Sequence, residues 1–248
     1  MISDQIVITA FLAFCRIGAC FMLMPGLSSV RVPMQIRLFV AIAVTFALLI
    51  HLWDSLLPYA SRAPDVLAPM VVSELLTGAL IGLVTRFYIL ALQFIGSAIA
   101  MMSGYGNMVA SGIEEAEPQA AVTNLITLSA LLLLFIFNFH HEIIKALVNS
   151  YEVAPPNLLF NPRSALTDMV DVLSEAFLVM VQLGSPFIAY GIIVNLAIGF
   201  VNKLTPQIPI YFISLPFVLA GGILLLYLGI GPLLRLFADG FVPITIGR

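Results

Sequence analysis

Four residues spaced by four, Glu74, Gly78, Gly82 and Arg86, bring charge and small side chains together within an apolar run. On a helix Glu74, Gly78 and Gly82 share one stripe, and Arg86 lies at its edge. The glycine pair would let another helix backbone approach closely. Charged groups inside a membrane segment are costly, so the set predicts either a proton or ion relay or a charge pair that holds helices together. Because the neighbouring apolar runs contain no acidic partner for Glu74, the structural role is favoured.

Arg16 is a second charge inside an apolar run, between Gln5 and Met24. Its long side chain could extend to a membrane–water interface, or it could pair with Glu74 across two helices. Sequence spacing leaves both alternatives open, and Arg16 joins Glu74 and Arg86 as a candidate buried charge.

A second cluster, His140-His141-Glu142, has the residue types of a zinc site. In the zinc-protease motif two histidines four residues apart bind the metal, and a glutamate between them acts as the base. Here the fourth position after His141 is Lys145, whose positive charge would repel the ion. We therefore expect polar residues at a helix end, no bound metal, and no role for the isolated His51.

The stretch from residue 101 to 118 is rich in glycine and methionine and has an acidic end. Glycine permits backbone conformations with positive φ, and methionine makes adaptable apolar contacts. Such a segment suits either the lining or plug of a pore or an ordinary loop between helices, and composition alone favours the ordinary loop. The candidate sealing residues are Met101, Met102, Gly104, Tyr105, Gly106, Met108 and Gly112.

The overall composition limits what kind of protein can carry these residues. Of 248 residues, 61% are hydrophobic and 9% are charged, and the mean hydropathy is +1.11. An ordinary soluble domain carries about 25% charged residues, which argues against a soluble enzyme or a disordered regulator. The net charge of −3 removes the basic surface that binding to nucleic acid needs. A multi-pass membrane protein remains, or a subunit whose apolar surface is covered by partners.

The chain also lacks the residue patterns of common active sites. It contains no evident serine–histidine–acid set, phosphate-binding glycine loop or pair of catalytic carboxylates. We therefore expect a protein that is not an enzyme and that carries no cofactor.

Apolar runs long enough for membrane helices fill most of the chain. The run from 66 to 102 suits one very long helix or two helices broken near Gly96, and prolines between 58 and 69 and from 155 to 162 indicate loops. We expect an all-α fold with a single helical domain over residues 1–248. The expected apolar runs cover residues 5–24, 36–53, 66–102, 122–139, 176–202 and 204–234.

Glycine and proline recur throughout the C-terminal apolar half. Each proline removes a backbone donor and disfavours helix just before it. Inside hydrocarbon the carbonyls freed in this way need protein or a wet cavity as their partner. We therefore expect long, Pro- and Gly-interrupted helices that lie against other helices, including helices of other chains. The residues concerned are Gly184, Pro186, Gly191, Asn195, Gly199, Pro206, Pro209 and Pro216.

Three groups of residues resemble the FliR family, and together they cover nearly the whole chain. The first includes Arg16, Pro25 and the Glu74 stripe, and the second is the loop from Gly104 to Pro118, which ends in Glu-Pro where the family usually has Asp-Pro. The third and most specific group follows the family pattern of Asn, Gly, Asn, a basic residue, Pro and Gln. Its members here are Asn195, Gly199, Asn202, Lys203, Pro206 and Gln207, with Pro216 further on.

The resemblance implies a helical subunit of the flagellar type III protein export gate, which helps form and seal the channel for unfolded flagellar proteins. It implies assembly with FliP-type and FliQ-type subunits, nearby larger membrane-anchored gate proteins, and a place in the bacterial inner membrane at the flagellar basal body. By the same resemblance, the stretch from Met101 to Pro118 corresponds to the loop that plugs the closed pore. The alternatives are a homologous virulence injectisome subunit, a secondary transporter that uses Glu74 and Arg86, and a purely structural assembly factor.

Overall fold

The long apolar runs fold as helices in the computed structural model, which describes residues 2–61, 63–106, 109–111 and 118–245. Two short antiparallel strands lie between the third and fourth helices. The prediction of an all-α, multi-helix hydrophobic protein is confirmed. The elements are α1 (Ile2–Leu23), α2 (Met34–Ala60), α3 (Pro64–Met102), β1 (Val109–Ser111), β2 (Pro118–Ala120), α4 (Ala121–Ile136), α5 (Phe139–Val153), α6 (Pro162–Leu204) and α7 (Ile210–Thr245).

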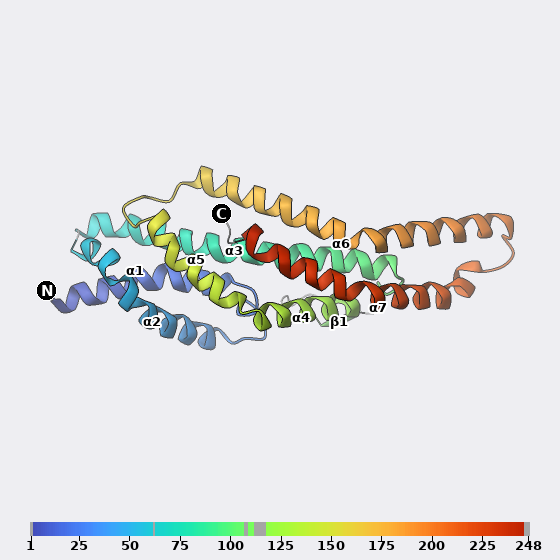
Figure 1. Cartoon of the computed structure of the whole chain (residues 1–248), viewed down its shortest axis with the longest axis horizontal. Helices are drawn as coiled ribbons and strands as arrows, with labels where there is room; N and C mark the ends of the chain where they lie inside the picture. The colour runs from blue at the N-terminus through green and yellow to red at the C-terminus, as the bar shows by residue number, and fades with distance from the viewer. Residues whose placement is uncertain (1, 62, 107–108, 112–117, 246–248) are drawn as a thin grey trace.

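Helix α3 forms the centre of an elongated bundle (Figure 1). It packs against α1, α4, α6 and α7, while α2 packs on α1. Large side chains of α3 such as Leu92, Ile95 and Ile99 are buried among these neighbours. At one end of the bundle, the α6–α7 hairpin extends beyond the other helices (Figure 1). The central helix therefore connects a packed region near the N-terminus to a projecting hairpin.

Local sequence signals explain where several helices end. Helix α1 stops just before Pro25 and Gly26, and Gly26 takes a positive φ of 83° that suits glycine. Asn138 is also left-handed, with φ of 57°, and it separates α4 from α5, which are bent by 66° relative to each other. At the start of α6, the Asn161 side-chain oxygen accepts the Arg163 backbone N–H at 3.1 Å and so caps the helix.

The proline-rich stretch from 58 to 69 is mostly helical, which corrects the loop predicted there. Helix α2 continues through Pro58 to Ala60 instead of ending near Trp53, and α3 already begins at Pro64 and contains Pro69. Proline is tolerated in the first turn of a helix because the N–H that it lacks would have no intrahelical partner there. This explains Pro64, which begins α3, whereas Pro58 and Pro69 lie inside their helices beyond the first turn.

Two other boundaries depend on tertiary packing. The run from 66 to 102 is part of one continuous helix, and Gly96 does not break it. Instead, Gly96 lets α4 approach, since a Cβ there would lie 3.2 Å from the Thr123 Cγ2 atom. The run from 122 to 139, expected as one helix, is divided at Asn138 between α4 and α5.

Some prolines of the C-terminal half lie inside continuous helices, whereas Pro206 and Pro209 lie in the turn between α6 and α7, so the predicted interruption is present at that turn but not within either helix. Pro186 is inside α6 and Pro216 is inside α7. Pro186 cannot donate to the Gln182 carbonyl four residues earlier, and the Ser185 hydroxyl donates to that oxygen instead at 2.8 Å. The backbone acceptor is thus satisfied without ending the helix. Figure 1 shows that the axis of α6 changes direction about midway along its length.

The segment expected as a plain loop between residues 103 and 118 contains strand β1 and the first residue of β2. The strands pair antiparallel, with Val109 opposite Ala120 and Ser111 opposite Pro118. A ladder of this kind supplies partners for backbone N–H and C=O groups that a bare loop would leave unpaired. The loop prediction is therefore wrong at these positions, although the helical class of the fold is unaffected.

Among the described residues, α1, α2, α3, α6 and α7 are each long and apolar enough to cross a membrane, and the bent pair α4–α5 qualifies as a broken span. With 39 and 43 residues, α3 and α6 are about 58 and 65 Å long, roughly twice the hydrocarbon thickness of a bilayer. Parts of both helices must therefore leave the hydrocarbon. Only 6% of the most apolar stretch of α7 is buried within the chain, so this helix needs lipid or a partner chain as cover.

Candidate functional site: a buried charge pair and the root of the central loop

Arg16 of α1 and Glu74 of α3 form a two-bond ion pair inside the molecule. The Arg16 Nε atom donates to Glu74 Oε2 at 2.8 Å, and Arg16 Nη2 donates to Glu74 Oε1 at 2.6 Å. The two side chains are 1% and 0% exposed. Arg16 therefore pairs with Glu74, and its side chain does not extend to a membrane–water interface. Two parallel N–H···O bonds fix how α1 is rotated against α3 as well as holding the helices together.

The remaining donor capacity of Arg16 is used on α5 and the residue that follows it. Arg16 Nη1 donates to Ser150 Oγ at 3.0 Å, and Nη2 also donates to the Ala154 carbonyl oxygen at 2.7 Å. The guanidinium carbon lies 3.9 Å from the centre of the Tyr151 ring. Ala154 caps the C-terminus of α5, where carbonyl groups have no intrahelical donor. One side chain thus connects α1, α3 and α5.

Gly78 and Gly82 allow α1 to come this close to α3. A Cβ at Gly78 would overlap the Arg16 carbonyl oxygen, and a Cβ at Gly82 would lie 2.6 Å from the Cys20 carbonyl oxygen. No larger residue fits at either position unless α1 moves. The stripe therefore acts as one surface, on which the glycines set the distance between the helices and Glu74 fixes their rotation.

Arg86, the fourth residue of the stripe, does not belong to this cluster. It follows Glu74 by 12 residues on α3, which is about 18 Å along the helix, and it is half-buried. Both carboxylate oxygens of Glu74 accept hydrogen bonds from Arg16 in a place closed to solvent. This geometry favours the structural role of Glu74 over a relay of protons or ions.

Gly104 ends helix α3 through a common capping turn. Its φ is 82°, its N–H donates to the Met101 carbonyl at 3.2 Å, and the Tyr105 N–H donates to the Ala100 carbonyl at 2.8 Å. These two bonds form a Schellman motif, which favours glycine at the left-handed position. The turn satisfies two carbonyls at the end of α3 and sets the direction in which the chain leaves it. We refer to residues 103–106, which make this turn and lead toward β1, as the loop root.

The other sealing candidates do not lie on one surface. Met101 is 68% exposed, whereas Met102 packs against Gly191 of α6. Gly106 has no positive φ, and a Cβ there would lie 3.3 Å from Met101 Cγ. Of this set, Met101 therefore faces outward and Met102 belongs to the helix packing. Two further candidates, Met108 and Gly112, lie outside the described residues.

Tyr105 connects the loop root to α7. Its hydroxyl donates to the Leu219 carbonyl oxygen at 3.0 Å. Desolvation raises the pKa of the Tyr105 phenol above its ordinary value, with a further contribution from Tyr190. Tyr190 of α6 donates to the adjacent carbonyl, that of Val218, at 2.8 Å. Two tyrosines therefore attach the loop root and α6 to the same turn of α7.

The residues of the Asn-Gly-Asn-Lys-Pro-Gln pattern occupy the last turns of α6 and the turn into α7. A Cβ at Gly199 would meet nothing within 4 Å, and Asn195 donates to the Gly191 carbonyl of its own helix at 2.8 Å. Large apolar neighbours such as Leu204 and Phe212 are 81% and 80% exposed. In the described part of the chain the end of the hairpin is thus left without cover. The pattern's other exposed members are Asn202, Lys203, Pro206 and Gln207.

Sequence inspection missed the aromatic anchor of α7. The fully buried Tyr88 of α3 donates to the Phe237 carbonyl at 3.0 Å, and its ring lies 5.0 Å from Phe237 and 5.5 Å from Phe241. A Cβ at Gly240 would lie 2.5 Å from the Tyr88 hydroxyl. A buried tyrosine in the middle of an apolar run needs a hydrogen-bond partner for its hydroxyl. The position of Tyr88 in such a run could therefore have predicted a contact with another helix.

The histidine cluster is divided between packing and a surface pair. The rings of His140 and His141 lie 4.2 Å apart, and Glu142 pairs with Lys145 at 2.7 Å on the surface. In the described ranges, no three residues of the kinds that bind metals come together. This arrangement offers no ready-made set of metal ligands.

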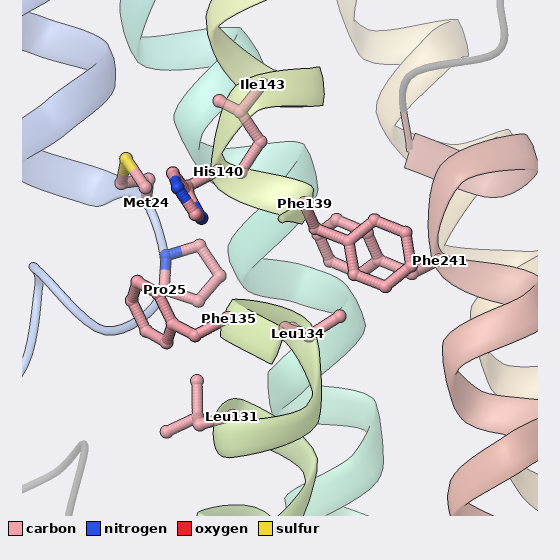
Figure 2. Close-up of a pocket in the computed structure, with 9 residues that line it drawn as sticks. All are labelled: Met24, Pro25, Leu131, Leu134, Phe135, Phe139, His140, Ile143 and Phe241. Carbon is pink, nitrogen blue, oxygen red and sulfur yellow. The ribbon is translucent and has the colours of Figure 1, made fainter. Parts of the chain in front are cut away.

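A small apolar pocket lies beside His140 at the bend between α4 and α5. Figure 2 shows His140 next to Met24 and Pro25, while Phe139 points toward Phe241. The rings of Phe139 and Phe241 are 5.3 Å apart. The pocket has a volume of about 20 Å³, which is room for one water molecule and not for a substrate. It therefore belongs to the packing of the bend.

Comparison with known proteins gives a match over nearly the whole chain. The family model described as bacterial export proteins, family 1, matches residues 7–243. The chain is 28% identical to flagellar biosynthetic protein FliR of Caulobacter vibrioides, over 95% of this chain and 93% of that protein. Proteins of the same name from Aquifex aeolicus and Escherichia coli are 27% and 29% identical, over 92% and 87% of this chain and 87% and 82% of theirs. The matched range includes the charge pair, the loop root and the hairpin.

Replacing Glu74 by glutamine is expected to destabilise the chain strongly, because Arg16 then keeps a buried charge without its counter-charge. Removing one partner of a buried pair costs about 3–5 kcal/mol of unfolding free energy. The measurement is thermal unfolding of the full chain in detergent. As a control, Lys145→Met breaks the exposed pair with Glu142 and should cost less than about 1 kcal/mol. Equally small effects of both changes would contradict the role given to the pair.

Replacing Gly78 by alanine is expected to lower the melting temperature, because the new methyl group meets the Arg16 carbonyl oxygen. Overpacking of this kind costs about 1–3 kcal/mol. At Gly231 of α7 a Cβ would meet nothing within 4 Å, so Gly231→Ala should leave stability unchanged or raise it slightly. A Gly78→Ala chain that melts as high as the Gly231→Ala chain would show that the helices are not in close contact there.

Proposed function

The chain belongs to the bacterial export proteins, family 1, and we propose that it is a core subunit of the flagellar type III protein export gate. In this role it helps form and seal the channel through which unfolded flagellar proteins are secreted. The observation that carries the proposal is the family match over residues 7–243. The flagellar names of the relatives favour a flagellar gate over a virulence injectisome.

The chain is a multi-pass membrane protein of the bacterial inner membrane, and its place is the flagellar basal body. Five apolar helices and the bent pair α4–α5 support a multi-pass membrane protein. The flagellar relatives support the location in the inner membrane at the basal body. The lengths of α3 and α6 mean that the helices cannot all be simple spans. Neighbouring subunits would cover the apolar surface that leaves the hydrocarbon.

The partners in the proposal are FliP-type and FliQ-type gate subunits, with larger membrane-anchored gate proteins close by. The exposed end of the α6–α7 hairpin is the surface best suited to them. Apolar side chains such as Leu204 and Phe212 would supply the buried area, and Asn202, Lys203 and Gln207 would supply hydrogen bonds. A mixture of this kind is typical of protein interfaces.

The sealing role is assigned to the segment that begins at Met101. A channel wide enough for an unfolded polypeptide would leak ions unless its narrowest part were closed at rest. Met101 is exposed at the end of α3, and the turn at Gly104 sets the direction of the chain beyond it. A flexible, polarisable methionine side chain can fill an irregular gap and yield when a substrate arrives. Gating in this scheme is passive, and other proteins of the apparatus supply the energy.

Replacing Gly106 by leucine is expected to raise the resting ion conductance or to reduce secretion, because the added side chain displaces Met101. Gly106 is a better probe than Gly104, where any side chain would also strain the helix cap. The measurements are the conductance of inner-membrane vesicles that contain the gate and the amount of flagellar protein secreted into the medium. Val153→Leu, a small change at an exposed position of α5 away from both the loop root and the hairpin, is the control and should leave both unchanged. Normal secretion with no added leak in Gly106→Leu would contradict the sealing role.

Replacing Leu204 by glutamate is expected to reduce the recovery of partner subunits at least tenfold, because a charge enters an apolar interface. The melting temperature of the isolated chain should not change, since Leu204 is 81% exposed. Val153 at the end of α5 is 82% exposed and provides the control, as Val153→Glu lies away from the hairpin. The measurement is affinity purification in detergent with quantitation of the co-purified subunits. Undiminished recovery with Leu204→Glu would remove the hairpin from the interface.

A further inference from the structure

The end of α3 is seated against the backbone of the α6–α7 hairpin. A Cβ at Gly191 would lie 2.7 Å from Met102 Cβ. A Cβ at Gly222 would lie 2.7 Å from Ser103 Cβ and 2.9 Å from the Ser103 carbonyl oxygen. The last residues of α3 thus meet both helices of the hairpin without an intervening side chain. The contact surface on the hairpin, the glycine notch, consists of Gly191, Gly221 and Gly222.

Hydrogen bonds hold the contact at the glycine notch in place. The Tyr105 hydroxyl donates to the Leu219 carbonyl at 3.0 Å, and the Tyr190 hydroxyl donates to the Val218 carbonyl at 2.8 Å. Gly221 makes room for the Tyr190 hydroxyl, since a Cβ there would overlap it. The first bond joins the loop root to α7, and the second joins the two helices of the hairpin. The two bonds have the same chemistry and neighbouring acceptors, but only one involves the loop root.

The hairpin has weak points close to the glycine notch. Pro186 lies five residues before Gly191 on α6, and Pro216 lies five residues before Gly221 on α7. Each proline removes one backbone hydrogen bond from its helix, and proline is a common site of helix bending. Beyond the notch the hairpin is exposed, as the 80% exposure of Phe212 illustrates. Pro186 lies on the core side of the notch and Pro216 on the side of the hairpin end, so the two weak points flank the level at which the loop root is attached.

We propose that Tyr105 and the glycine notch form a latch, through which the α6–α7 hairpin, and not the core around α3 alone, positions the loop root. Tyr105 is the positioning residue, and Ser103 is the residue in direct contact with α7. A neighbouring subunit or a passing polypeptide that displaces the hairpin would move the loop root with it. The consequence for ion leak rests on the proposed sealing function, whereas the latch itself is a property of this chain.

The first test perturbs the latch from the side of the loop root. Tyr105→Phe keeps the ring and removes the bond to Leu219, so the turn that caps α3 should open more often. Hydrogen exchange of the peptide covering residues 100–106, in the full chain purified with its co-purifying subunits, should become about fivefold faster, as the loss of one hydrogen bond implies. Tyr88→Phe is the matched control, because it removes a tyrosine–carbonyl bond between α3 and α7 that lies away from the loop root, and it should change this exchange less than twofold. Equal effects of the two variants, or no effect of Tyr105→Phe, would overturn the latch.

The second test perturbs the latch from the side of the hairpin. Gly222→Ala places a methyl group against Ser103 and should speed exchange of the same peptide, although the two residues are 119 positions apart in the sequence. Gly231→Ala, on the same helix and in open space, should not. Unchanged exchange in Gly222→Ala would show that α3 alone sets the loop root.

Conductance of inner-membrane vesicles separates the latch from the sealing function. If sealing and latch are both correct, Gly106→Leu and Gly222→Ala should both raise the resting leak, and Gly231→Ala should not. A leak with Gly106→Leu but none with Gly222→Ala would overturn the latch and leave the seal. Faster exchange in Gly222→Ala without a leak in either variant would support the latch and contradict the seal.

Discussion

The fold depends on a constraint of solvation: a charge inside so apolar a chain is tolerable only if every part of it is satisfied. Arg16 meets this condition through Glu74, Ser150 and the Ala154 carbonyl, and it can do so only when α1, α3 and the end of α5 lie in one arrangement. A buried pair adds little net stability when complete and costs a great deal when broken. Its main effect is therefore to penalise other packings of helices whose apolar surfaces would otherwise slide past one another.

That constraint divides the molecule into two parts with different dependence on other chains. Around the charge pair, the stripe of small residues on α3 brings the backbones of α1 and α3 into contact, and the region is packed within the chain itself. At the projecting end of α6 and α7, large apolar side chains remain uncovered, although the other ends of both helices are packed in the core through residues such as Phe187 and Phe237. The packed part can fix the position of α3, while the hairpin offers its surface to lipid and to neighbouring subunits. The loop root lies where the two parts meet.

The sequence was most informative where a residue pattern is compatible with only one kind of structure. Low charge and long apolar runs were enough for the helical class, and the spacing of Glu74 and Gly78 was enough for a helix contact. It was least informative about proline, because a helix can accommodate proline when a side chain such as Ser185 satisfies the freed carbonyl. The partners of Arg16 on α5 could not be predicted, since a serine and a carbonyl 134 and 138 residues away leave no signal in local spacing. The bond from Tyr105 to the Leu219 carbonyl was missed for the same reason, whereas Tyr88, a tyrosine inside an apolar run, carried a signal that did not identify its partner.

The central claim is that this chain is a required part of the flagellar protein export gate, and secretion tests it most directly. The gene would be deleted from the bacterium that carries it, and flagellar proteins in the culture medium would be measured alongside their levels inside the cell. The account predicts normal synthesis, no secretion, and recovery of secretion when the intact chain is supplied again. Secretion that continues at the normal level without the chain would contradict it.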